Sequence, residues 1–283
     1  MKRTLVIPLA LAALLAARPG IARADTPASE GPRPLWQLSA YEPMYLLPAY
    51  YTFSPYDAIY GNTLPNGQTL SKLELKFQLS FKIALMSSGP AKNAYIAYTQ
   101  SSYWQCYGNS AFFRETNYAP ELLIAPANRW DLGAGWNLGF RVVPVGHQSN
   151  GRGGNMERNW NRTSVDLLFE RLDGGGDGWT ADLRAWDVWR GSAYRRYNPD
   201  LARYLGYMRP SVAYKRGPWE LFFAFRNQFE SAFRRGSVEA SVSHHLGNSW
   251  NLYAQYFNGY GQSLIEYDHS TNALGVGFAL RTR

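Results

Sequence analysis

One segment of the chain alternates between apolar and polar residues too regularly for anything but a β-strand. From Leu73 to Leu85 every second residue is apolar, and the residues between them include Glu74, Lys76 and Lys82. A strand places these two sets on opposite faces. A helix with the same sequence would distribute charge around its whole circumference. The segment therefore predicts a strand with one apolar and one polar face.

The same theme repeats from about residue 44 to the end of the chain. Segments of roughly ten to twenty residues, several of them alternating, are separated by clusters of turn-forming residues. No segment has a convincing helical period, so the chain is predicted to be all-β. The eleven turn clusters leave about twelve strands and lie at Gly61–Gly67, Ser87–Lys92, Gly108–Ser110, Gly133–Gly135, Asn150–Gly154, Asp173–Gly178, Arg190–Asp200, Lys215–Pro218, Arg234–Gly236, Gly247–Asn248 and Asp268–Asn272.

Two kinds of barrel fit this pattern, and alternation alone does not separate them. A soluble barrel turns its apolar face inward, whereas a membrane barrel turns it outward. Strands long enough to cross a tilted bilayer, Tyr and Trp crowded near the segment ends, and an even strand number favour the membrane. We therefore expect a twelve-stranded antiparallel transmembrane β-barrel, with a soluble exported ligand-binding barrel as an alternative.

The N-terminus has the features of a secretory signal peptide. Lys2 and Arg3 precede an apolar run from Leu5 to Ala17, and Ala22-Arg23-Ala24 forms an A-x-A cleavage site. We expect residues 1–24 to be the signal peptide, residues 25–43 a proline-containing tail and residues 44–283 a single barrel domain. Export of a barrel through such a signal predicts a location in the bacterial outer membrane.

Charge and cysteine content exclude several classes of function. The chain has 29 basic and 21 acidic residues, for a formal net charge of +8. Four of the basic residues lie in residues 1–24, which contain no acidic residue, so the exported part carries only +4. Such a small excess does not support nucleic-acid binding, and none is expected. The single cysteine, Cys106, excludes an intramolecular disulfide framework and a cysteine-cluster metal site.

Chemistry-bearing residues gather in one predicted hairpin, which reads GHQSNGRGGNMERNWNR over residues 146–162. His147 and Ser149 lie two apart at the end of a strand, so their side chains share a face. If the hairpin is symmetric about residue 154, His147 lies opposite Asn161 and Ser149 opposite Asn159. A polar loop rim that holds an unrelated His and Ser is the alternative interpretation.

This arrangement has the composition of a catalytic triad. Ser149 would be the nucleophile, His147 its general base, and Asn161 the residue that fixes the tautomer and orientation of the imidazole. A neutral Asn is physically sensible near lipid, where an ionised carboxylate would carry a large desolvation cost. The backbone N–H of Gly151 could contribute to an oxyanion hole.

Several motifs together resemble the outer membrane phospholipase A family. HQSNGR at residues 147–152 is followed by WNR at 160–162, and FRETNYAPEL at 113–122, YTQ at 98–100 and GYGQSLIEY at 259–267 match as well. The resemblance implies a twelve-stranded barrel enzyme that hydrolyses either acyl chain of phospholipids and also lysophospholipids. It implies that Ser149, His147 and Asn161 form the triad on the outer surface, facing the substrate bilayer.

The resemblance also implies calcium and a homodimer. Arg152 matches the position whose backbone carbonyl binds Ca²⁺ beside the oxyanion hole, and Ser110 matches a ligand contributed by the other subunit. The remaining family ligand is a serine, replaced here by Glu157, whose carboxylate is a better ligand for a hard cation. Retained calcium binding and a displaced metal are both compatible with this exchange. Gln100 matches an interfacial glutamine of the family's dimer, in which the monomer lacks a complete calcium site and acyl-chain pocket.

A second class of function remains to be weighed. The chain would then be an outer-membrane channel or a catalytically inactive barrel descendant of the enzyme. Ser149, His147 and Asn161 are all intact, which an inactive descendant need not keep, so the enzyme is favoured.

Overall fold

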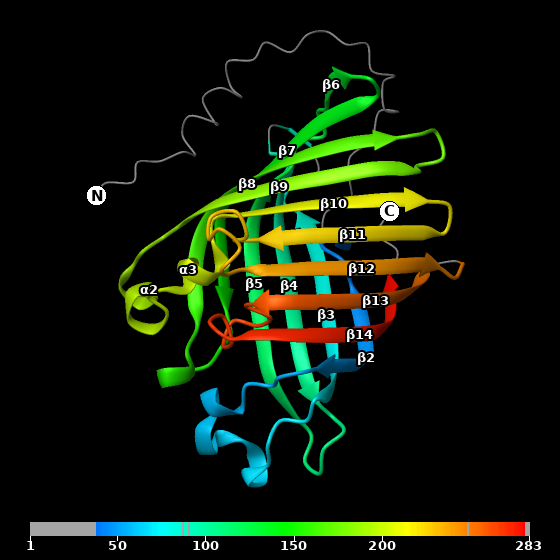
Figure 1. The fold of residues 1–283 in the computed structure, drawn as a ribbon. Coiled ribbons are helices and arrows are strands. Elements are labelled where there is room, and N and C mark those ends of the chain that lie inside the picture. The colour runs from blue at the N-terminus through cyan, green and yellow to red at the C-terminus, as the bar shows by residue number, and fades with distance from the viewer. Residues whose placement is uncertain (1–37, 87, 90, 248, 281–283) are drawn as a thin grey trace.

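The chain forms a closed antiparallel barrel of twelve strands, as predicted (Figure 1). The computed structural model describes residues 38–86, 88–89, 91–247 and 249–280, so the predicted signal peptide and residues 25–37 lie outside the described residues. Two short strands, β1 and β6, are additions to the ring and pair with β3 and β7. The strands are β1 (Leu38–Ala40), β2 (Tyr45–Thr52), β3 (Leu73–Ala84), β4 (Ala94–Gln105), β5 (Phe112–Ile124), β6 (Trp130–Gly133), β7 (Trp136–Ser149), β8 (Asn159–Leu172), β9 (Gly178–Val188), β10 (Met208–Arg216), β11 (Trp219–Arg226), β12 (Ser237–His245), β13 (Trp250–Tyr260) and β14 (Ser270–Leu280).

Each barrel strand pairs with the next one along the chain, and β14 closes the ring by pairing with β2. Every predicted turn cluster overlaps a connection between consecutive barrel strands, which confirms the segmentation read from Gly, Pro, Asn and Asp. The described part of the predicted tail contains β1, which pairs with residues 81–83 of β3, whereas β2 pairs with residues 73–78. β1 and β2 therefore lie along β3 as two parts of one interrupted strand.

The barrel turns its apolar side chains outward. On β3, Leu79 is 49% exposed, whereas Glu74 is 1% and Lys76 is 5% exposed. On β14, Leu274 and Phe278 are likewise exposed large apolar side chains. A water-soluble barrel would show the opposite arrangement, because burial of apolar surface drives its folding. The pattern is that of a membrane-spanning barrel, and it settles the direction that alternation alone left open.

Ion pairs and hydrogen bonds fill part of the interior. The Arg114 guanidinium binds both carboxylate oxygens of Glu74, at 2.7 and 2.8 Å, and a carboxylate oxygen of Glu266 at 2.9 Å. The Lys76 ammonium donates to Gln255 Oε1 at 2.7 Å. Buried charges persist only where partners compensate their lost hydration. Because Glu266 follows β13, this network fixes the connection 261–269 to the inner wall.

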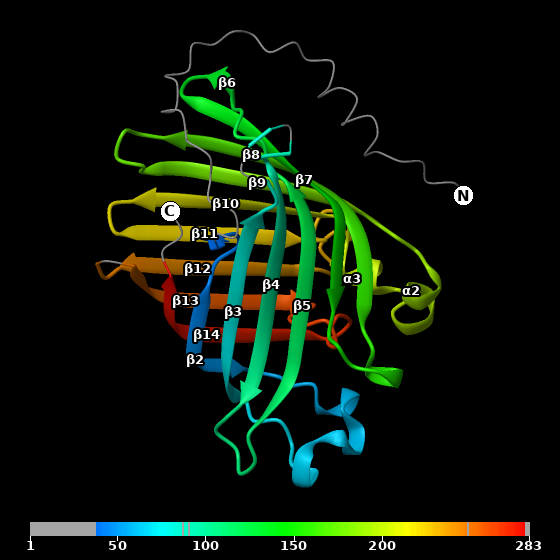
Figure 2. The ribbon, with the colours of Figure 1, turned by 180° about the vertical axis from the view of Figure 1, so that it is seen from behind.

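The long connections gather at one end of the barrel, as Figures 1 and 2 show. Antiparallel order places 53–72, 106–111, 150–158, 189–207, 227–236 and 261–269 together, and this end carries the two longest connections, 53–72 and 189–207. Two short helices interrupt the connection 189–207 after β9, and sequence reasoning missed both, because five or six residues are too few to show a helical period. No helix within the described residues is long and apolar enough to cross a membrane. The helical elements are η1 (Asp57–Ile59), η2 (Gly61–Thr63), η3 (Pro65–Gly67), η4 (Gly154–Met156), α2 (Ser192–Tyr197) and α3 (Leu201–Leu205).

Side chains from the long connections pack together at this end. One buried cluster joins Trp160 and Trp186, from β8 and β9, to Leu201 and Leu205 of α3 and to Leu264 of the connection 261–269. A second cluster joins residues of the connection 53–72 to Ile265. The end of the barrel that carries the predicted catalytic hairpin is therefore packed with side chains.

Candidate active site

The hairpin between β7 and β8 has the predicted register. His147 pairs with Asn161 and Ser149 with Asn159. Its connecting loop, residues 150–158, is organised by the buried Asn150 side chain. Asn150 Oδ1 accepts hydrogen bonds from the backbone N–H of Arg152 at 3.3 Å and of Arg158 at 3.0 Å. Sequence reasoning missed this role of Asn150, although a buried Asn beside a glycine is a common means of fixing a turn.

The half-buried His147 and Asn161 side chains make a short hydrogen bond across the hairpin. His147 Nδ1 and Asn161 Oδ1 lie 2.7 Å apart. Because an amide oxygen only accepts, Nδ1 must carry the proton when the oxygen faces it. The neutral imidazole then has its lone pair on Nε2, which is the nitrogen that a general base needs.

Ser149 ends β7 on the same face as His147, and that face is the outer one. Its cross-strand partner on β5 is Tyr118, whose side chain is 39% exposed on the barrel surface. Residues that pair across neighbouring strands share a face. The Ser149 hydroxyl oxygen accepts a hydrogen bond from Gly151 N–H at 3.0 Å. Within the described residues the Ser149 hydroxyl makes no hydrogen bond to His147. The hydrogen bond between a nucleophile and its base commonly tightens only when substrate is bound.

The backbone of Gly151 adopts a conformation that favours glycine. Its φ is +65°, in the left-handed region. A Cβ built at this position would lie 3.1 Å from the Tyr118 ring. The close approach of the two residues holds the Gly151 N–H beside Ser149. The predicted oxyanion donor and the predicted nucleophile are therefore adjacent.

Gln100 lies on the same outer row as the nucleophile. It pairs with Leu79 of β3 on one side and with Tyr118 of β5 on the other, and Tyr118 in turn pairs with Ser149. Its amide accepts from the Tyr98 hydroxyl at 2.8 Å and donates to Ser102 Oγ at 3.1 Å. The structure thus brings the predicted dimer-interface residue within two strands of Ser149, between Leu79 and Tyr118 on the neighbouring strands.

Two of the three predicted calcium ligands share the loop 150–158. The backbone carbonyl of Arg152 accepts no hydrogen bond within the described residues. Glu157 Oε1 accepts from Asn159 Nδ2 at 2.6 Å, and its second oxygen has no partner there. Ser110 lies on a separate connection, where its carbonyl accepts from Gln68 Nε2 at 3.1 Å. No group of three or more His, Cys, Asp or Glu side chains that could hold a metal occurs in the described part of the chain.

The Arg152 side chain turns away from its own carbonyl and anchors the loop to the inner wall. Its Nε lies 3.0 Å from the buried Glu115 carboxylate of β5, and its guanidinium lies over the Tyr60 ring at 5.5 Å. Glu115 also accepts from Asn117 Nδ2 at 2.9 Å and from Ile265 N–H at 3.3 Å. Burial raises the pKa of the Tyr60 phenol above its ordinary value, so the ring stays neutral. Glu115 therefore ties the site loop to the connection 261–269.

Sequence reasoning did not identify Glu115. The available signal was that Glu115 lies two residues before Asn117 in FRETNY, so a regular strand places both side chains on one face. The neighbouring Arg114 also faces inward, so the strand departs from simple alternation there. β5 and β4 shift register between Tyr103 and Trp104, opposite this point. Such a bulge reorients side chains near functional sites, and it explains why two successive charged residues are both buried.

Comparison with known proteins supports the assignment drawn from the motifs. The profile of the phospholipase A1 family matches residues 25–280. The chain is 34% identical over 247 residues to phospholipase A1 of Klebsiella pneumoniae, which covers 86% of this chain and 82% of that protein. It is 33% identical over 213 residues to phospholipase A1 of Escherichia coli strain K12, with 74% and 70% covered.

Solved structures agree with the sequence relatives. The Salmonella typhi outer membrane phospholipase dimer with bound calcium superposes with a TM-score of 0.77 at 30% identity, over 87% of this chain and 93% of that one. An active-site mutant of Escherichia coli outer membrane phospholipase A, in which an asparagine is replaced by alanine, gives a TM-score of 0.78 at 29% identity, over 89% and 95%. The barrel has outward-facing apolar side chains, and both its motifs and these matches agree with one assignment. The chain belongs to the phospholipase A1 family.

Proposed function

We propose that this chain hydrolyses the acyl ester bonds of phospholipids and lysophospholipids with a Ser149–His147–Asn161 triad. One observation carries the proposal. The 2.7 Å hydrogen bond between His147 Nδ1 and Asn161 Oδ1 leaves Nε2 free on the face that Ser149 shares. That face is the outer surface of a membrane barrel, where the ester bonds of lipids are accessible without entry into the lumen.

The arrangement supports acyl transfer in two steps. Ser149 Oγ attacks the ester carbonyl while His147 Nε2 takes the hydroxyl proton, and the Gly151 N–H donates to the developing oxyanion. The tetrahedral intermediate expels the alcohol, which leaves with the proton returned by His147. A water molecule, activated by the same imidazole, then releases the fatty acid from Ser149. Asn161 holds the imidazole in the required tautomer throughout.

Calcium fits the oxygen donors of the site loop. The Arg152 carbonyl and one Glu157 oxygen are uncommitted, and both are ligand types that Ca²⁺ prefers. Ser110 of the partner subunit would complete the protein ligands. A bound Ca²⁺ would supply Lewis-acid polarisation of the ester carbonyl. The Salmonella typhi relative, described as a dimer with bound calcium, supports this part of the proposal.

We further propose that the active form is a homodimer in the bacterial outer membrane. Gln100 offers a polar group on the outer face, between Leu79 and Tyr118 and near enough to Ser149 for a second copy to complete the site. The substrates are the lipids of the surrounding membrane, which reach Ser149 at the outer surface of the barrel.

The channel alternative finds less support. The buried network around Arg114 and the clusters formed by the long connections occupy the barrel. An open pore needs a continuous water-filled lumen, as in larger barrels.

Phospholipid hydrolysis by the chain without residues 1–24, refolded in detergent, tests the proposal. We expect calcium-dependent release of fatty acid from wild type, and loss of release in Ser149→Ala. Ser270→Ala, at an exposed serine of β14 on another part of the barrel, is the matched control and should keep full activity. Unchanged hydrolysis in Ser149→Ala would refute the triad, and hydrolysis unaffected by EDTA would refute the calcium requirement alone.

A further inference from the structure

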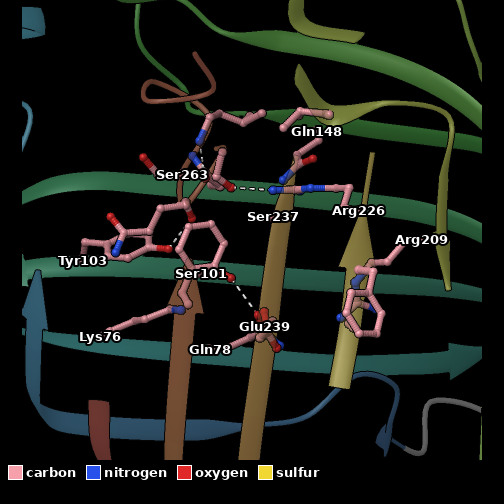
Figure 3. A pocket seen from close by; sticks show the side chains of 18 of the residues that line it. Lys76, Gln78, Ser101, Tyr103, Gln148, Arg209, Arg226, Ser237, Glu239 and Ser263 are labelled. Carbon is pink, nitrogen blue, oxygen red and sulfur yellow. Dashed lines mark hydrogen bonds between the residues drawn. The ribbon is translucent and has the colours of Figure 1, made fainter. Parts of the chain in front are cut away.

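A second polar site lies inside the barrel, on the opposite side of the wall from Ser149. A cavity of about 170 Å³ is bounded by β3, β10, β11, β12 and the connection 261–269 (Figure 3). Three basic side chains line it, Lys76 of β3, Arg209 of β10 and Arg226 of β11, together with one acidic side chain, Glu239 of β12. The proposed hydrolysis uses none of these residues.

The basic groups have hydrogen-bond donors that the protein leaves unused. Within the described residues, the Arg209 guanidinium makes no hydrogen bond, and it lies over the Phe222 ring, 5.6 Å from the ring centre. Arg226 Nη2 donates to the carbonyl of Gly261 at 2.7 Å, yet its buried Nε has no partner. The Lys76 ammonium has three N–H donors and uses one of them in the hydrogen bond to Gln255.

The charges of the cavity do not balance. Within the described residues, no carboxylate forms an ion pair within 4.0 Å with Lys76, Arg209 or Arg226. Arg209 repels Arg226 electrostatically, whereas Glu239 attracts both Arg226 and Lys76. Against these three cations stands the single carboxylate of Glu239, so the lining carries a charge of +2. Lys76 is buried, and Arg209 and Arg226 are half-buried. Cations withdrawn from water without full compensation are costly, which makes an anion the expected occupant.

We propose that this cavity binds a small divalent oxoanion, of the sulfate or hydrogen phosphate class. Two negative charges neutralise the lining, and the forked donors of guanidinium groups match tetrahedral oxoanions. The buried Ser237 hydroxyl, which also lines the cavity, supplies a neutral donor. The volume equals that of about five or six water molecules, which suits such an ion with a few waters and excludes an intact phospholipid.

Thermal unfolding of the full barrel in detergent, with sodium sulfate as the probe, tests the site. Sulfate at millimolar concentration should raise the apparent Tm of wild type by about 3 °C over sodium chloride at the same ionic strength. Arg209→Gln removes one cation and its free donors, and should abolish the shift. Arg216→Gln, the same exchange at an exposed position of the same strand, is the matched control and should keep it.

Glu239→Gln provides a test of opposite sign. It raises the lining charge to +3, so sulfate should bind about tenfold more tightly by calorimetric titration. Equal sulfate protection of wild type and Arg209→Gln would overturn the proposal, as would weaker binding to Glu239→Gln. A Tm rise with glycerol phosphate but none with sulfate or inorganic phosphate would also overturn it, because the site would then recognise a lipid headgroup fragment.

Discussion

At the scale of single residues, one hydrogen bond decides how the site would work. The Asn161 amide oxygen orients His147, and a carboxylate at that position would place an extra charge beside lipid. The sequence predicted this pair because a two-stranded hairpin fixes which residues face each other. It could not reveal the Arg152–Glu115 pair, because Glu115 and Arg152 lie far apart in the chain, and the bulge opposite Tyr103 and Trp104 that turns both Arg114 and Glu115 inward leaves no local pattern.

Glu115→Gln tests whether the buried carboxylate positions the site loop. The variant keeps an acceptor for Ile265 N–H but removes the charge that holds Arg152. We expect kcat to fall about tenfold, in keeping with the loss of a charged hydrogen bond, and the calcium concentration for half-maximal activity to rise. Glu170→Gln, at a partly exposed glutamate of β8, should change neither value. An unaltered calcium titration in Glu115→Gln would show that Arg152 does not depend on this anchor.

Glu157→Ala tests whether Glu157, which stands where the family has a serine, is a calcium ligand. Because the variant removes a carboxylate oxygen that is free to bind a cation, the calcium concentration for half-maximal hydrolysis should rise about tenfold or more. Activity at saturating calcium should largely recover. If the calcium titration of the variant overlays that of wild type, Glu157 is not a ligand.

At the scale of elements, the hairpin of β7 and β8 is the part of the structure that the sequence described best. The register, the loop and the shared face of His147 and Ser149 all follow from alternation and from the glycine-rich turn. The helices α2 and α3 were missed because tertiary packing against β8 and β9, rather than a local period, stabilises such short segments.

Gly151→Ala tests the conformation of that loop. Alanine at a φ of +65° costs about 1–2 kcal/mol, and its methyl group would press on the Tyr118 ring. We expect kcat to fall at least tenfold through displacement of the oxyanion donor. Gly153→Ala is the matched control, since its φ is −116° and no atom lies within 4 Å of a built Cβ. Equal activity of the two variants, measured by fatty-acid release, would contradict the role of the Gly151 N–H.

At the scale of the whole molecule, alternation in the sequence left open whether the apolar face of each strand points into the barrel or out of it. The same apolar and polar spacing builds a soluble or a membrane barrel, because each strand has the same two faces in both. Strand length and aromatic residues favoured the membrane, and the exposure of Leu79 beside the burial of Glu74 confirms it.

The packed end of the barrel predicts how the molecule behaves in a bilayer. Because buried side chains of the connections 189–207 and 261–269 pack together there, the refolded protein should show no stable single-channel conductance in planar bilayers. The conductance should be recorded from preparations that hydrolyse lipid. Steady, voltage-independent open channels from such a preparation would favour the channel function over the enzyme.

The central claim is that Ser149 is an activated nucleophile on the lipid-facing surface. A long-chain alkylsulfonyl fluoride reacts with such a serine, and mass spectrometry of the digested protein locates the adduct. With calcium present, we expect a single sulfonyl group on the peptide that contains Ser149, together with loss of hydrolysis, and no adduct in His147→Ala. Full inactivation with the label on another residue, or unimpaired labelling of Ser149 in His147→Ala, would contradict the account.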